Sequence, residues 1–82
     1  MESSAYTWLQ YFKNGASHYS LKIYPAAIDA FNKSIALKDN YYTYRGLGEA
    51  LFYTNNFPAA IDAFNKSIAL HERWDTYQVL GW

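Results

Sequence analysis

The side chains best suited to acid–base or metal chemistry in this 82-residue chain are its two histidines, His18 and His71. They fall in separate segments, and neither has a carboxylate at the spacing typical of metal ligands. Partial burial of His18 in a helix stripe and exposure of His71 near a helix end are the simpler interpretations. We therefore expect neither histidine to bind a metal.

Other chemical motifs are equally weak. Gly46-Leu47-Gly48 matches only part of a phosphate-binding glycine loop, and no nucleophile has a base at motif spacing. Asn32-Lys33-Ser34 and Asn65-Lys66-Ser67 match the N-glycosylation triplet but lie within predicted helices, in a chain with no secretory signal. The sequence thus predicts a protein that is not an enzyme and uses no cofactor.

An internal repeat is the strongest feature of the chain. Residues Pro25 to Leu37 and Pro58 to Leu70 are identical, and the two copies are offset by 33 residues. The same offset relates three further sets of residues: Trp8, Tyr41 and Trp74; Tyr11, Tyr44 and Tyr77; and Gly15, Gly48 and Gly81. A period of this size is typical of a solenoid, in which each unit packs on the next. It predicts one domain over residues 1–82, made of repeat one (8–40), repeat two (41–73) and a half repeat (74–82).

Each repeat contains two amphipathic patterns. Apolar or small residues recur at helical spacing in the sets Tyr44, Leu47, Gly48 and Leu51, and Ala27, Ile28, Phe31 and Ile35. Pro25 and Pro58 suit the first turn of a helix, and Asp39 or Asn40 can cap the next one. Five helices are predicted, at about 4–20, 25–37, 41–53, 58–70 and 74–82. Short connections require neighbouring helices to be antiparallel, so the predicted fold class is all-α.

Composition narrows the choice of partners and compartment. Lys plus Arg and Asp plus Glu number seven each, so the net charge of zero argues against binding to nucleic acid or an anionic membrane. The chain has no cysteine for disulfide or thiolate–metal bonds. Residues 1–4 do not resemble a signal peptide, and no run of eighteen apolar residues is present. These features predict a cytoplasmic protein.

The repeat resembles the tetratricopeptide repeat (TPR) family. In that family, small residues let the two helices of a unit approach closely, and large residues fill the gaps between units. Gly48 and Ala60 stand at small positions, and Tyr44, Leu47 and Phe64 at large ones. The first copy matches through Tyr11, Gly15, Ala27 and Phe31, and the half repeat through Tyr77, Leu80 and Gly81. The resemblance implies a right-handed solenoid of antiparallel helix pairs.

The chain departs from the family pattern at several points. Its period is 33 residues, one fewer than the roughly 34 usual in the family. Asp39 and Glu72 replace a frequent proline, and Asn14 stands where the family prefers leucine. Ser34 and Ser67 stand where it prefers alanine. We expect these changes to alter the superhelical twist without changing the fold class.

By resemblance, the first helix of each unit lines a concave groove that holds a peptide. The implied groove residues are Leu9, Phe12, Ala16 and Tyr19 from the first unit, Tyr42, Arg45, Glu49, Phe52 and Tyr53 from the second, and Asp75, Gln78 and Trp82 from the third. Family members that bind a terminal carboxylate use lysine and asparagine where this chain has Phe12 and Ala16. We therefore expect an aromatic groove for an apolar peptide, oriented by Arg45 and Glu49. Alternatively, about half of these side chains belong to the core, as aromatic stripes usually do.

The half repeat supplies a first helix without a second one. Its apolar residues Tyr77, Leu80 and Trp82 would remain exposed unless another molecule covers them. This predicts a homo-oligomer, most simply a dimer formed through the terminal helices or by exchange of helices between copies. Alternatively, the last helix is itself a sufficient cap.

Two function hypotheses follow from these features. The favoured one is a non-catalytic interaction module that binds a peptide or protein segment in the aromatic groove. The alternative is a self-assembling structural repeat whose main partner is another copy of itself. An RNA-binding helical repeat would need basic residues along the groove, and the zero net charge argues against it.

Overall fold

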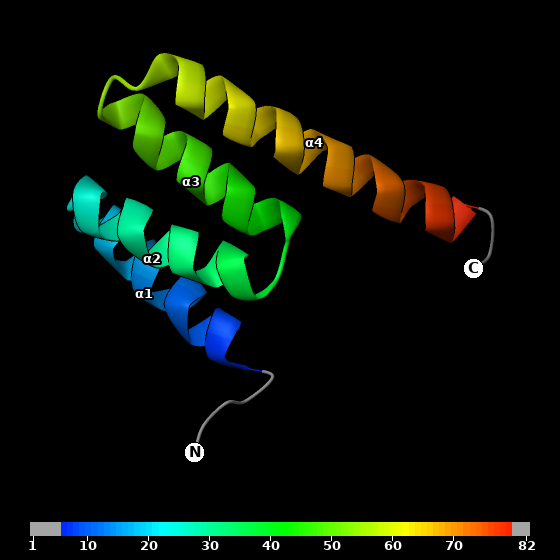
Figure 1. Ribbon diagram of the computed structural model, residues 1–82, viewed down its shortest axis with the longest axis horizontal. Helices are drawn as coiled ribbons and strands as arrows, with labels where there is room; N and C mark the ends of the chain where they lie inside the picture. Colours follow the sequence, from blue (N-terminus) through cyan, green and yellow to red (C-terminus); the bar gives the residue numbers. More distant parts are fainter. Residues whose placement is uncertain (1–5, 80–82) are drawn as a thin grey trace.

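A computed structural model describes the backbone of residues 6–79 and the side chains of residues 6–73. These residues form the helices α1 (Thr7–Ser20), α2 (Tyr24–Leu37), α3 (Tyr41–Tyr53) and α4 (Phe57–Val79) (Figure 1). No strand occurs within residues 6–79, so the predicted all-α class is confirmed. Within the same range, no helix combines the length and the apolar character needed to cross a membrane.

The four helices form two antiparallel hairpins that lie side by side, and α4 extends past the end of α3 (Figure 1). Helix α2 packs against both α1 and α3, and α3 also contacts α1 and α4. Among the described residues, α4 packs against α3 alone. This arrangement is consistent with a helical repeat in which each hairpin is one unit.

The prediction of five helices is wrong at the C-terminal end. Residues 58–70 and 74–79 belong to one helix, α4, and no break occurs at Glu72-Arg73. The reason lies at the residue that caps α3: Asn40 accepts a hydrogen bond from the backbone N–H of Tyr42 (3.3 Å), whereas the equivalent residue is Arg73. An arginine side chain has no acceptor, and it favours the helix interior over a cap. Residues 80–82 of the predicted fifth helix lie outside the described residues, as do residues 4 and 5 of the first.

The two hairpin turns have the same conformation. Lys22 and Asn55, which are 33 residues apart, have φ angles of 64° and 65°. The next residue donates its N–H back into the helix in both turns, from Ile23 to the His18 carbonyl and from Asn56 to the Leu51 carbonyl, at 2.9 Å each. This is the pattern of a Schellman motif, which ends a helix with one left-handed residue. Asparagine tolerates that conformation better than lysine does.

Small residues allow the helices of each hairpin to approach closely. A Cβ atom added to Gly15 would lie 2.7 Å from the ring of Phe31, and one added to Gly48 would lie 2.8 Å from the ring of Phe64. The surrounding core consists of the buried residues Ala27, Phe31, Leu47, Ala50 and Ala63. The predicted small positions therefore do have the packing role that the sequence pattern indicated.

A second repeated contact joins the two helices of each hairpin. The hydroxyl of Ser34 donates to the carbonyl oxygen of Trp8 (2.8 Å), and that of Ser67 donates to the carbonyl oxygen of Tyr41 (2.7 Å). Both serines are buried. A serine at this position fixes the second helix of each hairpin to the first turn of the first helix, which an alanine could not do.

Candidate functional site

The predicted groove residues lie on α1 and α3, which are in direct contact. Because the residues from each helix recur at intervals of three, four or seven, they share one face of that helix. We call this surface the α1/α3 face. It comprises Leu9, Phe12, Tyr19, Tyr42, Arg45, Glu49, Phe52 and Tyr53.

Two ring contacts connect the helices across the α1/α3 face. Phe12 of α1 meets Tyr42 of α3 edge to face, with ring centroids 5.3 Å apart. Tyr19 meets Tyr53 at 6.2 Å in a tilted arrangement. Contacts of this geometry stabilise aromatic pairs beyond the burial of their area. Phe12 also contacts the core residue Phe31 at 5.9 Å, so part of the predicted groove belongs to the core.

A polar contact accompanies the second pair. The Glu49 carboxylate of α3 acts electrostatically on the hydroxyl of Tyr19 of α1. Burial raises the pKa of Tyr19, and the nearby Glu49 carboxylate raises it further. Both effects favour the neutral form of the phenol.

The rest of the α1/α3 face is more open. Phe52 and Tyr53 are 50% and 56% exposed, and Arg45 is exposed as well. Leu9 is half-buried. Exposed aromatic rings near one cationic side chain are suited to apolar peptide side chains beside a polar group. Asp75, Gln78 and Trp82 were also predicted for the groove, and their side chains lie outside the described part of the chain.

Two aromatic residues of the second helices extend this surface and were not predicted as site residues. Tyr24 of α2 stacks on Tyr53 at 5.3 Å with an interplanar angle of 13°. Phe57 of α4 contacts Phe52 at 5.5 Å. A signal for both was available, because an aromatic residue precedes the proline in each copy of the repeat.

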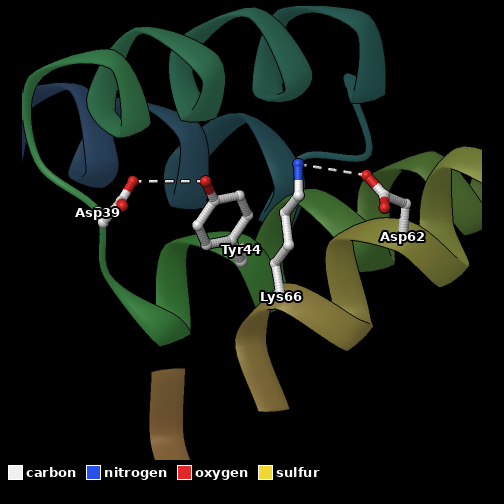
Figure 2. Close-up of polar contacts among 4 residues, drawn as sticks. All are labelled: Asp39, Tyr44, Asp62 and Lys66. Atoms are coloured by element: carbon white, nitrogen blue, oxygen red, sulfur yellow. Dashed lines mark hydrogen bonds and ion pairs between the residues drawn. The ribbon is translucent and has the colours of Figure 1, made fainter. Parts of the chain in front are cut away.

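A separate polar cluster joins the turn between the repeats to helices α3 and α4. The hydroxyl of Tyr44 donates to Asp39 (3.4 Å), and Lys66 pairs with Asp62 (3.4 Å) while its ammonium group lies 5.8 Å from the centre of the Tyr44 ring (Figure 2). Burial raises the pKa of Tyr44, and the Asp39 carboxylate adds to the effect. Lys33 occupies the same position over Tyr11 in the first repeat and pairs with Asp29. The cluster holds neighbouring helices together and contains no arrangement of nucleophile and base.

The histidines take part in local contacts. Nδ1 of His18 lies 2.8 Å from the carbonyl oxygen of Asn14, one turn earlier in α1. His71 meets the ring of Tyr41 edge to face at 4.8 Å. Within the part of the chain that the structure describes, no three histidine, aspartate or glutamate residues are grouped so as to hold a metal ion.

One of the predicted self-association residues, Tyr77, lies in α4. Tyr77 belongs to the helix, but its side chain lies outside the described residues, as do Leu80 and Trp82.

No protein-family profile, curated protein or solved structure matches this chain.

Proposed function

We propose that this protein is a non-catalytic interaction module of the tetratricopeptide type, which binds a peptide or protein segment across the α1/α3 face. The observation that carries the proposal is the pairing of predicted groove residues across two helices, Phe12 with Tyr42 and Tyr19 with Tyr53. One aromatic surface thereby spans both repeats. A surface formed by two helices in fixed contact needs little reorganisation when it binds a ligand.

The solenoid part of the proposal rests on contacts that recur after 33 residues. The ring of Phe31 lies against Gly15 as that of Phe64 lies against Gly48. The serine hydrogen bonds and the left-handed turn residues recur in the same way. Repetition of contacts as well as of sequence supports two equivalent units that stack in series.

The chemistry of the α1/α3 face favours a ligand with apolar anchors. Phe52 and Tyr53 are the most accessible rings of this face, and aromatic residues of this kind supply most of the binding energy at many interfaces. Arg45 is available to an acidic or polar group of the ligand. Because the Glu49 carboxylate raises the pKa of Tyr19, we assign it the role of keeping that phenol neutral.

A peptide selection tests this proposal. A phage library of random twelve-residue peptides is selected on the immobilised chain, and enriched peptides are measured by fluorescence anisotropy. Phe52→Ala and Arg45→Ala should each weaken binding, Phe52→Ala by roughly tenfold, as expected for the loss of an anchor. Leu37→Ala, which removes an exposed residue at the end of α2, is the control and should leave affinity unchanged. Failure to enrich peptides, or equal affinity for all three variants, would contradict the proposal.

A further inference from the structure

Two identical segments of this chain differ in their surroundings. Ile28 and Ile35 of α2 are half-buried and pack against the core cluster, to which α3 contributes Leu47 and Ala50. The equivalent residues of α4, Ile61 and Ile68, are 59% and 55% exposed. Since the residue types and the helical register are the same, the difference comes from the neighbouring helices.

The missing neighbour can be identified from the first repeat. The ring of Phe31 lies against Gly15 of its own hairpin on one side and against Gly46 of α3 on the other. Phe64 has the first contact, through Gly48, and among the described residues no helix supplies the second. We call the uncovered surface, formed by Ile61, Phe64 and Ile68, the open face of α4. Its sequence is identical to that of the surface that α3 covers on α2, so its natural occupant is a helix like α3.

A segment related to α3 in sequence lies at residues 74–82. This segment repeats the α3 residues at five positions or replaces them conservatively: Trp74, Thr76, Tyr77, Leu80 and Gly81 stand where α3 has Tyr41, Thr43, Tyr44, Leu47 and Gly48. Helix α1 fits less well, because the charged Lys13 stands where α3 has Gly46 against Phe31, and Asn14 stands in place of Leu47; the later segment has the uncharged Val79 and Leu80 there. The open face therefore matches residues 74–82 and not the α1 surface of another copy.

Residues 74–79 cannot reach the open face of their own chain, because they continue the same helix. Helix α4 runs without a break from Phe57 to Val79, a length of about 34 Å. The residues equivalent to Phe31 and Gly46 are Phe64 and Val79, which lie on this one helix about 22 Å apart. Only a second molecule can bring a residue 79 beside Phe64.

We propose that two copies of this chain associate through antiparallel α4 helices, each placing residues 74–79 on the open face of the other. In this register Phe64 of one copy lies beside Val79 of its partner, and the reverse contact forms at the same time. The two-fold axis then passes between His71 and Glu72, midway between the two contacts. An isologous pair of this kind closes on itself and leaves no open face for further growth. The proposal is independent of peptide binding at the α1/α3 face.

The first test is the oligomeric state of the full chain, measured by sedimentation equilibrium over a concentration series. The wild type should show twice the 9.5 kDa of one chain. Ile61→Glu and Ile68→Glu should raise the dissociation constant at least tenfold, because each places a charge in the interface. Ala69→Glu adds the same charge to an exposed position about 100° further around α4 and should leave the dimer intact. A monomeric wild type, or a dimer insensitive to both isoleucine variants, would overturn the proposal.

The second test examines the register and does not depend on removing an apolar residue. The chain has no cysteine, so a single introduced thiol reports only on its own position. Glu72→Cys is placed next to the two-fold axis and should form a disulfide-linked dimer under mild oxidation, seen by non-reducing electrophoresis. Ala69→Cys, on the outer side of the helix, should form at most a tenth as much in the same time. Equal yields from the two variants would rule out the proposed register.

Discussion

The ring of Phe31 fills the space that a side chain at Gly15 would need. A Cβ atom at Gly15 would lie 2.7 Å from two ring carbons and 3.0 Å from Cγ, which is close to the Phe31 backbone. Rotation of the Phe31 ring would move its outer carbons and leave Cγ in place, so it cannot relieve the contact with a Cβ atom at Gly15. Gly46 differs, because its nearest neighbour is Cζ, the far end of the same ring, at 2.8 Å.

Gly15→Ala should therefore destabilise the fold and Gly46→Ala should cost less. Overpacking at Gly15 is expected to cost about 1–3 kcal/mol, of which better helix propensity offsets up to about 1 kcal/mol. For Gly46→Ala the two effects are expected to cancel to within about 1 kcal/mol. Urea denaturation followed by circular dichroism gives both values. Phe31→Leu in the Gly15→Ala background should recover part of the loss, and an unchanged or greater loss would argue against the clash.

The left-handed residue Lys22 is a site where stability can be gained. Lys22→Asn should raise the free energy of unfolding by about 0.5–1 kcal/mol, because asparagine adopts φ near 64° at lower cost. Asn55→Lys makes the opposite change at the equivalent turn and is expected to cost a similar amount. Thermal denaturation of both variants measures the difference, and changes of the same sign would contradict the explanation.

The buried hydroxyl of Thr43 differs from that of Ser34, which is hydrogen-bonded. Its hydroxyl is fully buried and has no hydrogen-bond partner among the described residues. Thr43→Val keeps the shape of the side chain and is expected to stabilise the protein by about 1 kcal/mol. Ser34→Ala, which removes the bond to the Trp8 carbonyl, should instead destabilise it by about 1 kcal/mol. Chemical denaturation of the two variants provides the comparison, and a destabilised Thr43→Val protein would indicate a partner for its hydroxyl.

Stability should fall at alkaline pH for an identifiable reason. Burial and a nearby carboxylate raise the pKa of both Tyr19 and Tyr44 in the folded state. A raised pKa means that the folded state favours the neutral phenol, so this contribution is complete below the ordinary value of about 10 and is lost as the pH rises through the folded-state pKa. Melting temperatures should decline above pH 10, and less steeply for Tyr19→Phe and Tyr44→Phe. Identical slopes in the variants and the wild type would exclude these two tyrosines as the cause.

Restoring the cap between the second and third units should change the course of α4. The double variant Glu72→Asp, Arg73→Asn recreates the Asp39-Asn40 pair, in which Asn40 caps α3. A capping asparagine is worth about 1 kcal/mol, and aspartate is a poorer helix former than glutamate. We expect the helix to end near residue 70 and the segment after it to fold back on the open face of its own chain. Backbone chemical shifts of residues 70–75 would report the break, and sedimentation would show a monomer; an unbroken helix would show that the cap is not decisive.

The sequence by itself determined the local features of this fold. The apolar period placed α1, α2 and α3 to within a few residues, because helical periodicity depends on neighbours along the chain. The resemblance to the tetratricopeptide repeat implied that Gly15 and Gly48 are close-packing positions, and it also implied that Phe12, Tyr19, Tyr42 and Tyr53 share faces of α1 and α3, which the structure brings together.

Only the tertiary structure decided the features that depend on non-local neighbours. The identical blocks Pro25 to Leu37 and Pro58 to Leu70 contain the same isoleucines, yet those of the first are half-buried and those of the second exposed. Tyr24 joined the aromatic surface only because α2 packs against α3 and brings it onto Tyr53. Burial depends on which helices pack against a segment, and identical sequences therefore have different environments where their neighbouring helices differ.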